Sequence, residues 1–340
     1  MHRFSLLALS LTLQLAVAEE PAAPSFSFES AGMPLRLEEL ASVEGIVWGM
    51  DFIDEHTMIF TVLRGELMLL DTRNGDTRSL RGVPEVHRVM GGGPFDQVLS
   101  SGLFEVLVDP DFANNRFVYL AYVKKVPGGH TLVVARARLE KDALTGLRDI
   151  FVANNASEGP GRWGTRLAMD EQRHLYIAVG DHRVTEDAQD LLSHGGKIVR
   201  LNADGSVPED NPFVGRDDTA PEVWSLGHRN PQGLAFHPET GELWEHEHGP
   251  DGGDEINVIE PGKNYGWPVI SRGVSRAGKP IGIGTEKEGM EQPLKYYEPG
   301  IAPSGMLFYQ GERYPAWNGN LFIGSLNRMR LNRLVSEGRK

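Results

Sequence analysis

The strongest constraint on the fold is a local pattern that recurs along the whole chain. A short polar turn is followed by an apolar run that is alternating or continuous, which is the pattern of a β-strand. The clearest copies are residues 54–62, 114–123, 171–181, 240–250 and 318–327. Their spacing of about 60 to 80 residues leaves room for one four-stranded sheet per copy, with long connections.

This spacing favours an all-β propeller over a β-sandwich, which is the structural alternative. Forty glycines and twenty-one prolines are spread through the chain, and helical periodicity is limited to a short piece near residues 187–193. Further strand-like runs lie at residues 131–139 and 196–202. The last copy of the pattern begins near Trp317 and the sequence stops at Lys340, so we expect the last blade to be missing.

The N-terminal segment predicts export. A short positive start precedes an apolar run over residues 4–17, and an Ala-Val-Ala step ends it. This predicts a signal peptide over residues 1–18 and a single propeller domain over residues 19–340. The alternative, a transmembrane anchor, requires about 20 apolar residues, and this run is shorter and interrupted by polar side chains. We therefore expect a periplasmic or secreted protein with no membrane span.

Composition excludes several classes of function. Cysteine is absent, which removes disulfides, thiolate metal sites and cysteine nucleophiles. The formal net charge is −13, whereas nucleic-acid binding needs clustered Lys and Arg. We expect no nucleic-acid partner, and we interpret the charge as a source of solubility.

Two polar segments are candidates for a ligand site. In Gly-His-Arg-Asn-Pro-Gln-Gly (residues 227–233) a guanidinium and a carboxamide, Arg229 and Asn230, follow a strand-like run and suit a planar, oxygen-rich anion. The alternative for this segment is an ordinary polar turn. Residues 247–257 combine four carboxylates, three glycines and a proline, which offer the hard oxygen ligands that calcium prefers. The alternative for that segment is an acidic turn facing solvent.

Together with their neighbours these segments resemble a known family. The segments that carry the resemblance are residues 205–215, 221–238, 243–269 and 289–309. They are similar to the PQQ-dependent aldose sugar dehydrogenases, relatives of soluble glucose dehydrogenase, and the likeness runs from about Trp48 to Ser325. It implies a six-bladed propeller that binds pyrroloquinoline quinone (PQQ) and calcium. It also implies hydride transfer from the anomeric carbon of an aldose to the quinone. The electron acceptor that then receives the electrons is unknown.

The resemblance also assigns roles to individual residues. Arg229 and Asn230 would contact the quinone, and the carbonyls of Gly249 and Pro250 would hold the calcium of the cofactor. A further calcium region in the same loop would be formed by Asp254, Glu255 and the carbonyl of Tyr265.

The sequence departs from the family pattern at the general base. Arg162 stands where the family has a histidine, and a guanidinium cannot accept a proton at neutral pH. Asp181 matches the carboxylate that orients this histidine, so we expect an Arg162–Asp181 ion pair. His182, beside Asp181, is the candidate substitute base.

Other matching positions are also altered. Ser100 replaces a glutamine that contacts the cofactor, Asn327 stands where a lysine occurs, and a C-terminal pair of arginines has no counterpart. The remaining nearby histidines are expected to be structural, namely His194, His228, His246 and His248. Two functions therefore stay open: a PQQ-dependent aldose dehydrogenase, impaired by these losses, or an inactive calcium-stabilised propeller that binds a sugar or a protein.

Overall fold

The computed structural model describes residues 25–30, 32–91, 100–327 and 329–335 of the chain. The chain divides into two compact units, Met1–Ser42 and Val43–Lys340. The described part of the first unit forms one antiparallel hairpin of β1 (Ser25–Ser30) and β2 (Met33–Glu38). The expected signal peptide lies outside the described residues.

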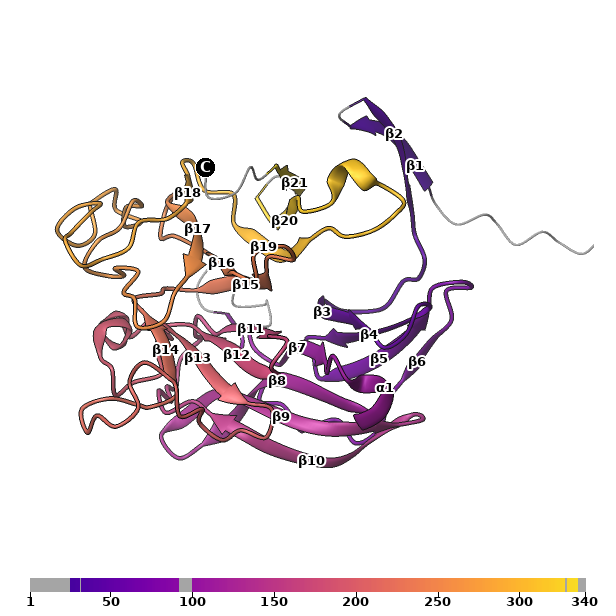
Figure 1. Ribbon diagram of the computed structural model, residues 1–340, viewed down its shortest axis with the longest axis horizontal. Helices are drawn as coiled ribbons and strands as arrows, with labels where there is room; N and C mark the ends of the chain where they lie inside the picture. The colour runs from indigo at the N-terminus through magenta and orange to yellow at the C-terminus, as the bar shows by residue number, and fades with distance from the viewer. Residues whose placement is uncertain (1–24, 31, 92–99, 328, 336–340) are drawn as a thin grey trace, which may run out of the picture. The chain divides into compact units, whose positions relative to one another are not determined.

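The described residues of the second unit form five sheets that follow one another along the chain (Figure 1). The first sheet contains β3 (Val47–Phe52), β4 (Thr57–Val62), β5 (Glu66–Asp71) and β6 (Thr77–Ser79). The second contains β7 (Leu103–Val108), β8 (Phe117–Val126), β9 (Gly129–Glu140) and β10 (Ala143–Val152). The third contains β11 (Gly164–Met169), β12 (His174–Val179), β13 (Lys197–Asn202) and β14 (Val223–Leu226). The fourth contains β15 (Pro231–Phe236), β16 (Leu243–Glu247), β17 (Asp254–Ile259) and β18 (Lys295–Tyr297), and the fifth contains β19 (Pro303–Phe308), β20 (Leu321–Ser325) and β21 (Arg330–Leu334).

Each sheet is an antiparallel meander in chain order, as expected of a propeller blade. The five recurring sequence segments are the second strands of these sheets, β4, β8, β12, β16 and β20. The first strand of each sheet contacts the first strand of the next, from β3 to β7, β11, β15 and β19. The all-β propeller prediction is therefore confirmed.

The expected number of blades is wrong for the described residues, which form five sheets and not six. Four of these sheets have four strands, and the fifth has three. The helical piece expected near residues 187–193 is a 3-10 helix at Thr185–Gln189, and a four-residue helix α1 at Phe112–Asn115 was not expected. In the described part of the chain no helix has the length and apolar character needed to cross a membrane.

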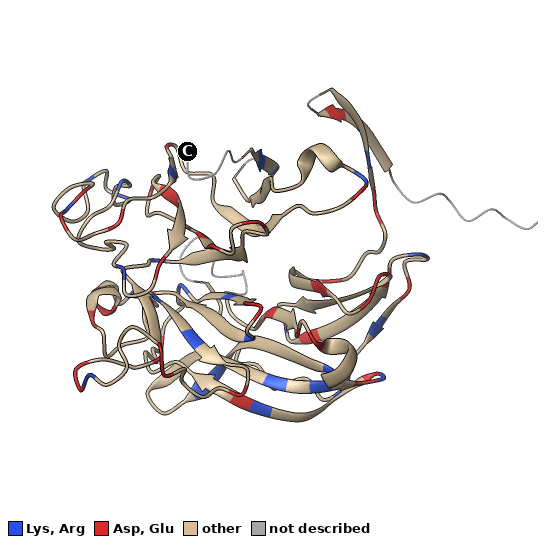
Figure 2. Ribbon diagram, in the orientation of Figure 1, with Lys and Arg blue, Asp and Glu red and all other residues tan. Residues whose placement is uncertain are grey.

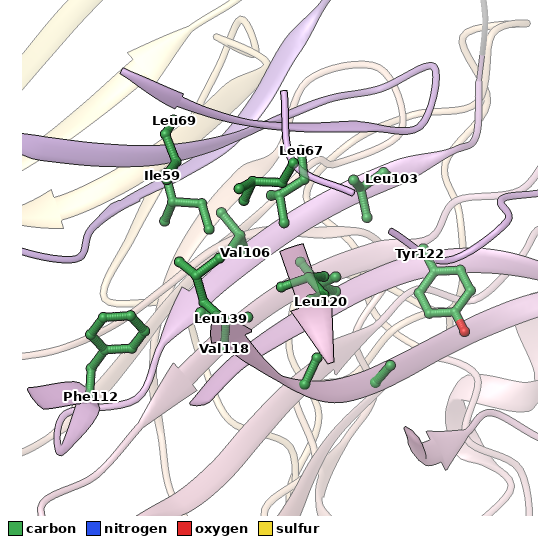
Figure 3. Close-up of a cluster of buried hydrophobic side chains, with 14 of the residues drawn as sticks. Ile59, Leu67, Leu69, Leu103, Val106, Phe112, Val118, Leu120, Tyr122 and Leu139 are labelled. Carbon is green, nitrogen blue, oxygen red and sulfur yellow. The ribbon is translucent and has the colours of Figure 1, made fainter. Parts of the chain in front are cut away.

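The hydrophobic core lies between neighbouring sheets. In one cluster Ile59 and Leu69 of the first sheet pack with Val106, Leu120 and other residues of the second, and Figure 3 shows their side chains pointing toward one another. A second cluster joins the second and third sheets, and further clusters join the third to the fourth and the fourth to the fifth. Burying both faces of a sheet in this way suits the continuous apolar runs of the sequence.

The strand order brings the candidate segments to one edge of the second unit. The first two strands of each sheet are antiparallel, so the residues before the first strand and after the second strand lie at the same edge. Gly164 at the start of β11 pairs with Val179 at the end of β12, and Pro231 pairs with Glu247 in the next sheet. The same rule places four candidate groups at this edge, namely Arg162, Asp181, Arg229 and the acidic loop after β16.

Candidate active site

Loops of the third, fourth and fifth sheets enclose a pocket of about 360 Å³ at this edge, here called the polar pocket. Arg162, Arg229, Asn230 and Asn327 contribute its cationic and amide side chains, and Gly249 and Pro250 form part of its wall. The structure thus brings together residues of sequence segments that lie far apart. The arrangement can bind a flat ligand that carries several oxygen atoms.

The Glu247 carboxylate holds the turn that presents Arg229 and Asn230. Its Oε2 atom accepts hydrogen bonds from the backbone N–H groups of both residues. The Arg229 Nη1 atom donates to the carbonyl of His248 over 2.7 Å, and its guanidinium lies 5.3 Å from the centre of the Trp267 ring. Burial and the charge of Arg162 lower the pKa of Arg229 to about 10. The guanidinium is charged at neutral pH, and the His248 carbonyl and the Trp267 ring hold it in place.

Arg162 and Asp181 form the ion pair that the sequence predicted. The Arg162 Nη1 atom donates to Asp181 Oδ2 over 2.6 Å, and the Asp181 side chain is fully buried. Trp267 Nε1 donates to the same oxygen over 2.9 Å, and the Arg183 N–H donates to Oδ1 over 2.8 Å. Asp181 is therefore saturated with donors, and Arg162 occupies the position of the expected base.

His182 is buried, and it is not among the residues that line the polar pocket. Its Nδ1 atom lies 2.9 Å from the carbonyl of Asn155, and its ring packs edge-on against Trp163 with 4.4 Å between centroids. Burial lowers the pKa of His182 to about 4. In this position the imidazole contacts protein groups and does not face the polar pocket.

The acidic loop after β16 is closed by Asp254. Its two carboxylate oxygens accept hydrogen bonds from the backbone N–H groups of Gly249 (2.8 Å) and Ala302 (2.7 Å). A Cβ atom on Gly249 would clash with the carbonyl oxygens of Gly252 and Gly253. The loop is so tight that only glycine fits at position 249, which keeps the neighbouring carbonyls in place.

A small cavity of about 20 Å³, here called the ion cavity, lies beside this loop. Glu247, Gly249, Pro250, Glu255 and Tyr265 are among its lining residues. The volume suits one water molecule or one ion. Burial, followed by the charge of Glu247, raises the pKa of Glu255 to about 8. Two neighbouring carboxylates beside backbone carbonyls form a donor set that fits calcium.

Further potential ligand atoms cluster around Glu247, which also lines the ion cavity. His228, Glu245 and Glu247 are buried, and one ligand atom from each lies within 4.8 Å of the others. Glu245 and Glu247 alternate along β16 and therefore point to the same face of the sheet. Burial, followed by the charge of Glu247, raises the pKa of Glu245 well above its ordinary value. Oε1 of Glu245 is buried and has no hydrogen-bond partner among the described residues.

The four histidines expected to be structural all have hydrogen-bond partners. His194 Nε2 lies 2.7 Å from Glu222 Oε1, and His228 Nε2 lies 2.9 Å from Ser225 Oγ. His246 Nε2 lies 3.0 Å from the carbonyl oxygen of Ser304, and His248 Nε2 lies 2.7 Å from that of Pro303.

Of two further candidate residues, one lines the polar pocket and the other does not. Asn327 lines the polar pocket and donates to the carbonyl of Gly300 over 2.9 Å. Ser100 precedes β7 at the same edge, but its hydroxyl donates to the carbonyl of Val89 over 2.9 Å and it does not line the polar pocket.

Glu247 and Trp267 have no predicted role in the sequence, but the structure places them among the residues that support the site. Both lie within residues 243–269, one of the segments that carry the family resemblance. Glu247 fixes the Arg229 turn, and Trp267 holds Asp181. No local sequence signal identifies the Trp267 contact, because it joins residues 86 positions apart in the chain. The fold and the site define a β-propeller with a polar pocket at one edge.

Comparisons with known proteins give its family. A family model described as Glucose / Sorbosone dehydrogenase matches residues 45–340. The aldose sugar dehydrogenase YliI of Escherichia coli (strain K12) is 39% identical over 285 residues, which cover 82% of this chain and 74% of that protein. The chain belongs to the glucose/sorbosone dehydrogenase family.

Solved structures agree with this assignment. The soluble aldose sugar dehydrogenase of Escherichia coli in the apo-form has a TM-score of 0.81 and 37% identity, with 87% of this chain and 84% of that chain covered. The PQQ-bound aldose sugar dehydrogenase of Streptomyces coelicolor has a TM-score of 0.71 and 25% identity, with 94% and 84% covered.

Proposed function

We propose that this protein is a PQQ-dependent aldose dehydrogenase that uses calcium and oxidises the anomeric carbon of a sugar to a lactone, outside the cytoplasm. Membership of a sugar dehydrogenase family supports the reaction class. The observation that carries the proposal is the convergence of Arg229, Asn230, Gly249 and Pro250 on one pocket. These are the residues that a flat polyanion and its cation would need.

Arg229, Asn230 and Asn327 would hold PQQ, which would supply a quinone carbon that accepts the hydride. The guanidinium of Arg229 can stabilise negative charge that develops on a ligand oxygen. It is suited to this task because the His248 carbonyl and the Trp267 ring fix its orientation. Calcium would be held by the carbonyls of Gly249 and Pro250, with Asp254, Glu255 and the carbonyl of Tyr265 nearby.

Because Arg162 and Asp181 form an ion pair, we expect a low rate of aldose oxidation. Oxidation of a sugar at its anomeric carbon requires that the hydroxyl group lose a proton, and a positioned base commonly contributes about a hundredfold to ten-thousandfold. Arg162 cannot be that base, and Asp181 already accepts three hydrogen bonds. We therefore expect slow turnover compared with a relative that has histidine at this position.

The same ion pair favours a second function, a calcium-stabilised propeller that binds a sugar or a protein partner without catalysis. An absorbance titration with PQQ and calcium, followed by a dye-coupled assay with aldoses, separates the two functions. The enzyme is expected to bind PQQ and to oxidise aldoses at a low rate, and Arg229→Gln is expected to weaken PQQ binding. Arg216→Gln is the matched control, because Arg216 lies in the loop between β13 and β14 and pairs with Asp218. Absence of PQQ binding by the wild-type protein would exclude the enzyme.

A further inference from the structure

A second pocket, of about 480 Å³, adjoins the polar pocket and is here called the arginine pocket. Its walls contain the guanidinium groups of Arg162, Arg183, Arg229 and Arg276. No aspartate or glutamate is among the described residues that line it. Acidic and basic residues are otherwise distributed over the loops and strands, as Figure 2 shows, and the whole chain has a net charge of −13. A local excess of arginine in an acidic protein indicates a site for an anion.

Two of these guanidinium groups have no protein partner among the described residues. Arg162 is neutralised by Asp181, and Arg229 donates to a carbonyl. The side chains of Arg183 and Arg276 make no hydrogen bond or ion pair in the described structure. Partial burial, together with the charges of Arg162 and Arg276, lowers the pKa of Arg183. Like charges this close repel each other, and a bound anion would relieve the repulsion.

The backbone that presents Arg183 is strained. His182 and Arg183 both have positive φ, 48° and 71°, which is uncommon for residues other than glycine. The turn is held by the Val184 N–H donating to the Asp181 carbonyl over 2.8 Å, and by the Arg183 N–H donating to the Asp181 side chain. Backbone strain of this kind clusters at ligand sites, and here it carries one arginine to the pocket wall.

The arginine pocket is continuous with the polar pocket. Arg162, Arg229 and Pro250 line both. A ligand in one pocket therefore lies beside a ligand in the other, as hydride transfer from a sugar to a quinone requires. Trp267 and Ile281 add apolar wall to the arginine pocket, which suits the C–H face of a sugar ring.

We propose that the arginine pocket binds the acidic group of an anionic sugar, a carboxylate or a phosphate, and that the substrate of this protein is an acidic and not a neutral aldose. The inference rests on the proposed function. Arg183 and Arg276 bind the acidic group, because a guanidinium presents a fork of donors that matches a carboxylate or phosphate. The reacting end of the sugar then lies at Arg162 and Arg229, beside the polar pocket. Neutral aldoses lack the group that these two arginines recognise.

The test is calorimetric titration of the PQQ-free protein, in calcium buffer, with glucuronate, glucose 6-phosphate and glucose. At least one of the two acidic sugars is expected to bind about tenfold or more tightly than glucose, with an affinity that falls as salt is added. Arg183→Gln with Arg276→Gln is expected to remove this preference. Arg216→Gln is the control, because it removes one exposed arginine without touching either pocket. Equal binding of neutral and acidic sugars would overturn the proposal.

A separate titration with PQQ identifies the source of the anion. The double variant is expected to bind PQQ with unchanged affinity. If it loses PQQ affinity instead, the two arginines bind a carboxylate of the cofactor, and the acidic-sugar proposal is wrong. If acidic sugars bind as expected and PQQ does not bind at all, the pocket assignment stands and the enzymatic function falls. Binding is measured without turnover, so slow catalysis does not obscure any of these outcomes.

Discussion

The Nη1 atom of Arg162 lies 2.6 Å from Oδ2 of Asp181, a carboxylate with no exposed surface. The pair joins the loop before β11 to the loop after β12, and Trp267, from the connection between β17 and β18, donates to the same carboxylate. A charge that is buried so completely persists only when it is paired and hydrogen-bonded. The ion pair stabilises this edge of the propeller, and it also leaves the Asp181 carboxylate unable to accept a proton or a hydrogen bond from a ligand.

Restoring an imidazole at position 162 should increase activity. Arg162→His provides a base that Asp181 can orient, as a carboxylate does for a catalytic histidine. We expect the rate of aldose oxidation with PQQ and calcium to rise about a hundredfold or more. Arg162→Gln is the control, because it removes the charge without supplying a base. Brisk turnover by the wild-type protein in the dye-coupled assay would show that another group is the base.

Asp181→Asn should destabilise the protein and Trp267→Phe should do so less. Asparagine keeps the size of the side chain but removes the charge that balances Arg162 and one acceptor oxygen, so we expect a loss of about 1–3 kcal/mol in the free energy of unfolding. The smaller effect of Trp267→Phe follows because Asp181 keeps two other donors. Urea unfolding at pH 7 measures both. A larger loss for Trp267→Phe would mean that packing, not the hydrogen bond, dominates.

Calcium should raise the melting temperature. Binding to the native state alone stabilises by mass action, by about 2.7 kcal/mol at a hundredfold excess over the dissociation constant. Glu255→Ala should remove most of this effect, because it deletes a carboxylate that lines the ion cavity. Thermal unfolding with calcium and with a chelator tests this. Glu66→Ala, in β5 of the first sheet, is the control, and an equal calcium effect in Glu255→Ala would place the ion elsewhere.

Acid should destabilise the protein partly through His182. Its pKa is about 4 in the folded state and about 6.5 when unfolded, so the unfolded state gains a proton first as the pH falls. This destabilisation is negligible above about pH 7.5, grows as the pH falls to about 4, and reaches about 2 kcal/mol at pH 5. Chemical unfolding of His182→Gln at pH 7 and pH 5 should show a smaller loss than the wild type. The exposed His56→Gln serves as the control, and an unchanged loss in His182→Gln would contradict the burial argument.

Local patterns were sufficient to predict the second strands. Each follows a polar turn and runs into an apolar core, as in residues 171–181, where the structure has β12. The first strand of the fourth sheet was not anticipated, because Pro231, Gln232 and Gly233 are read as a polar motif when taken alone. A strand whose burial depends on contacts with a neighbouring sheet is not marked by a local apolar pattern.

The candidate site was predictable where neighbouring residues in the sequence act together. Arg229 with Asn230, and Gly249 with Pro250, stand side by side in the sequence and line the same pocket in the structure. The contact of Trp267 with Asp181 joins residues 86 positions apart, and a single sequence does not encode such a distance visibly. The arginine pocket was missed for the same reason, because Arg183 and Arg276 come from separate loops.

The apolar clusters between sheets have a consequence for how the second unit opens. Each of these inter-sheet clusters takes its side chains from two sheets at once. Detaching one sheet would hydrate side chains of both neighbours, and the free energy of opening therefore grows with every interface that it exposes. Amide hydrogens in the middle strands of the second and third sheets should then exchange with solvent at one common slow rate. We therefore expect these blades to unfold together, in one cooperative transition.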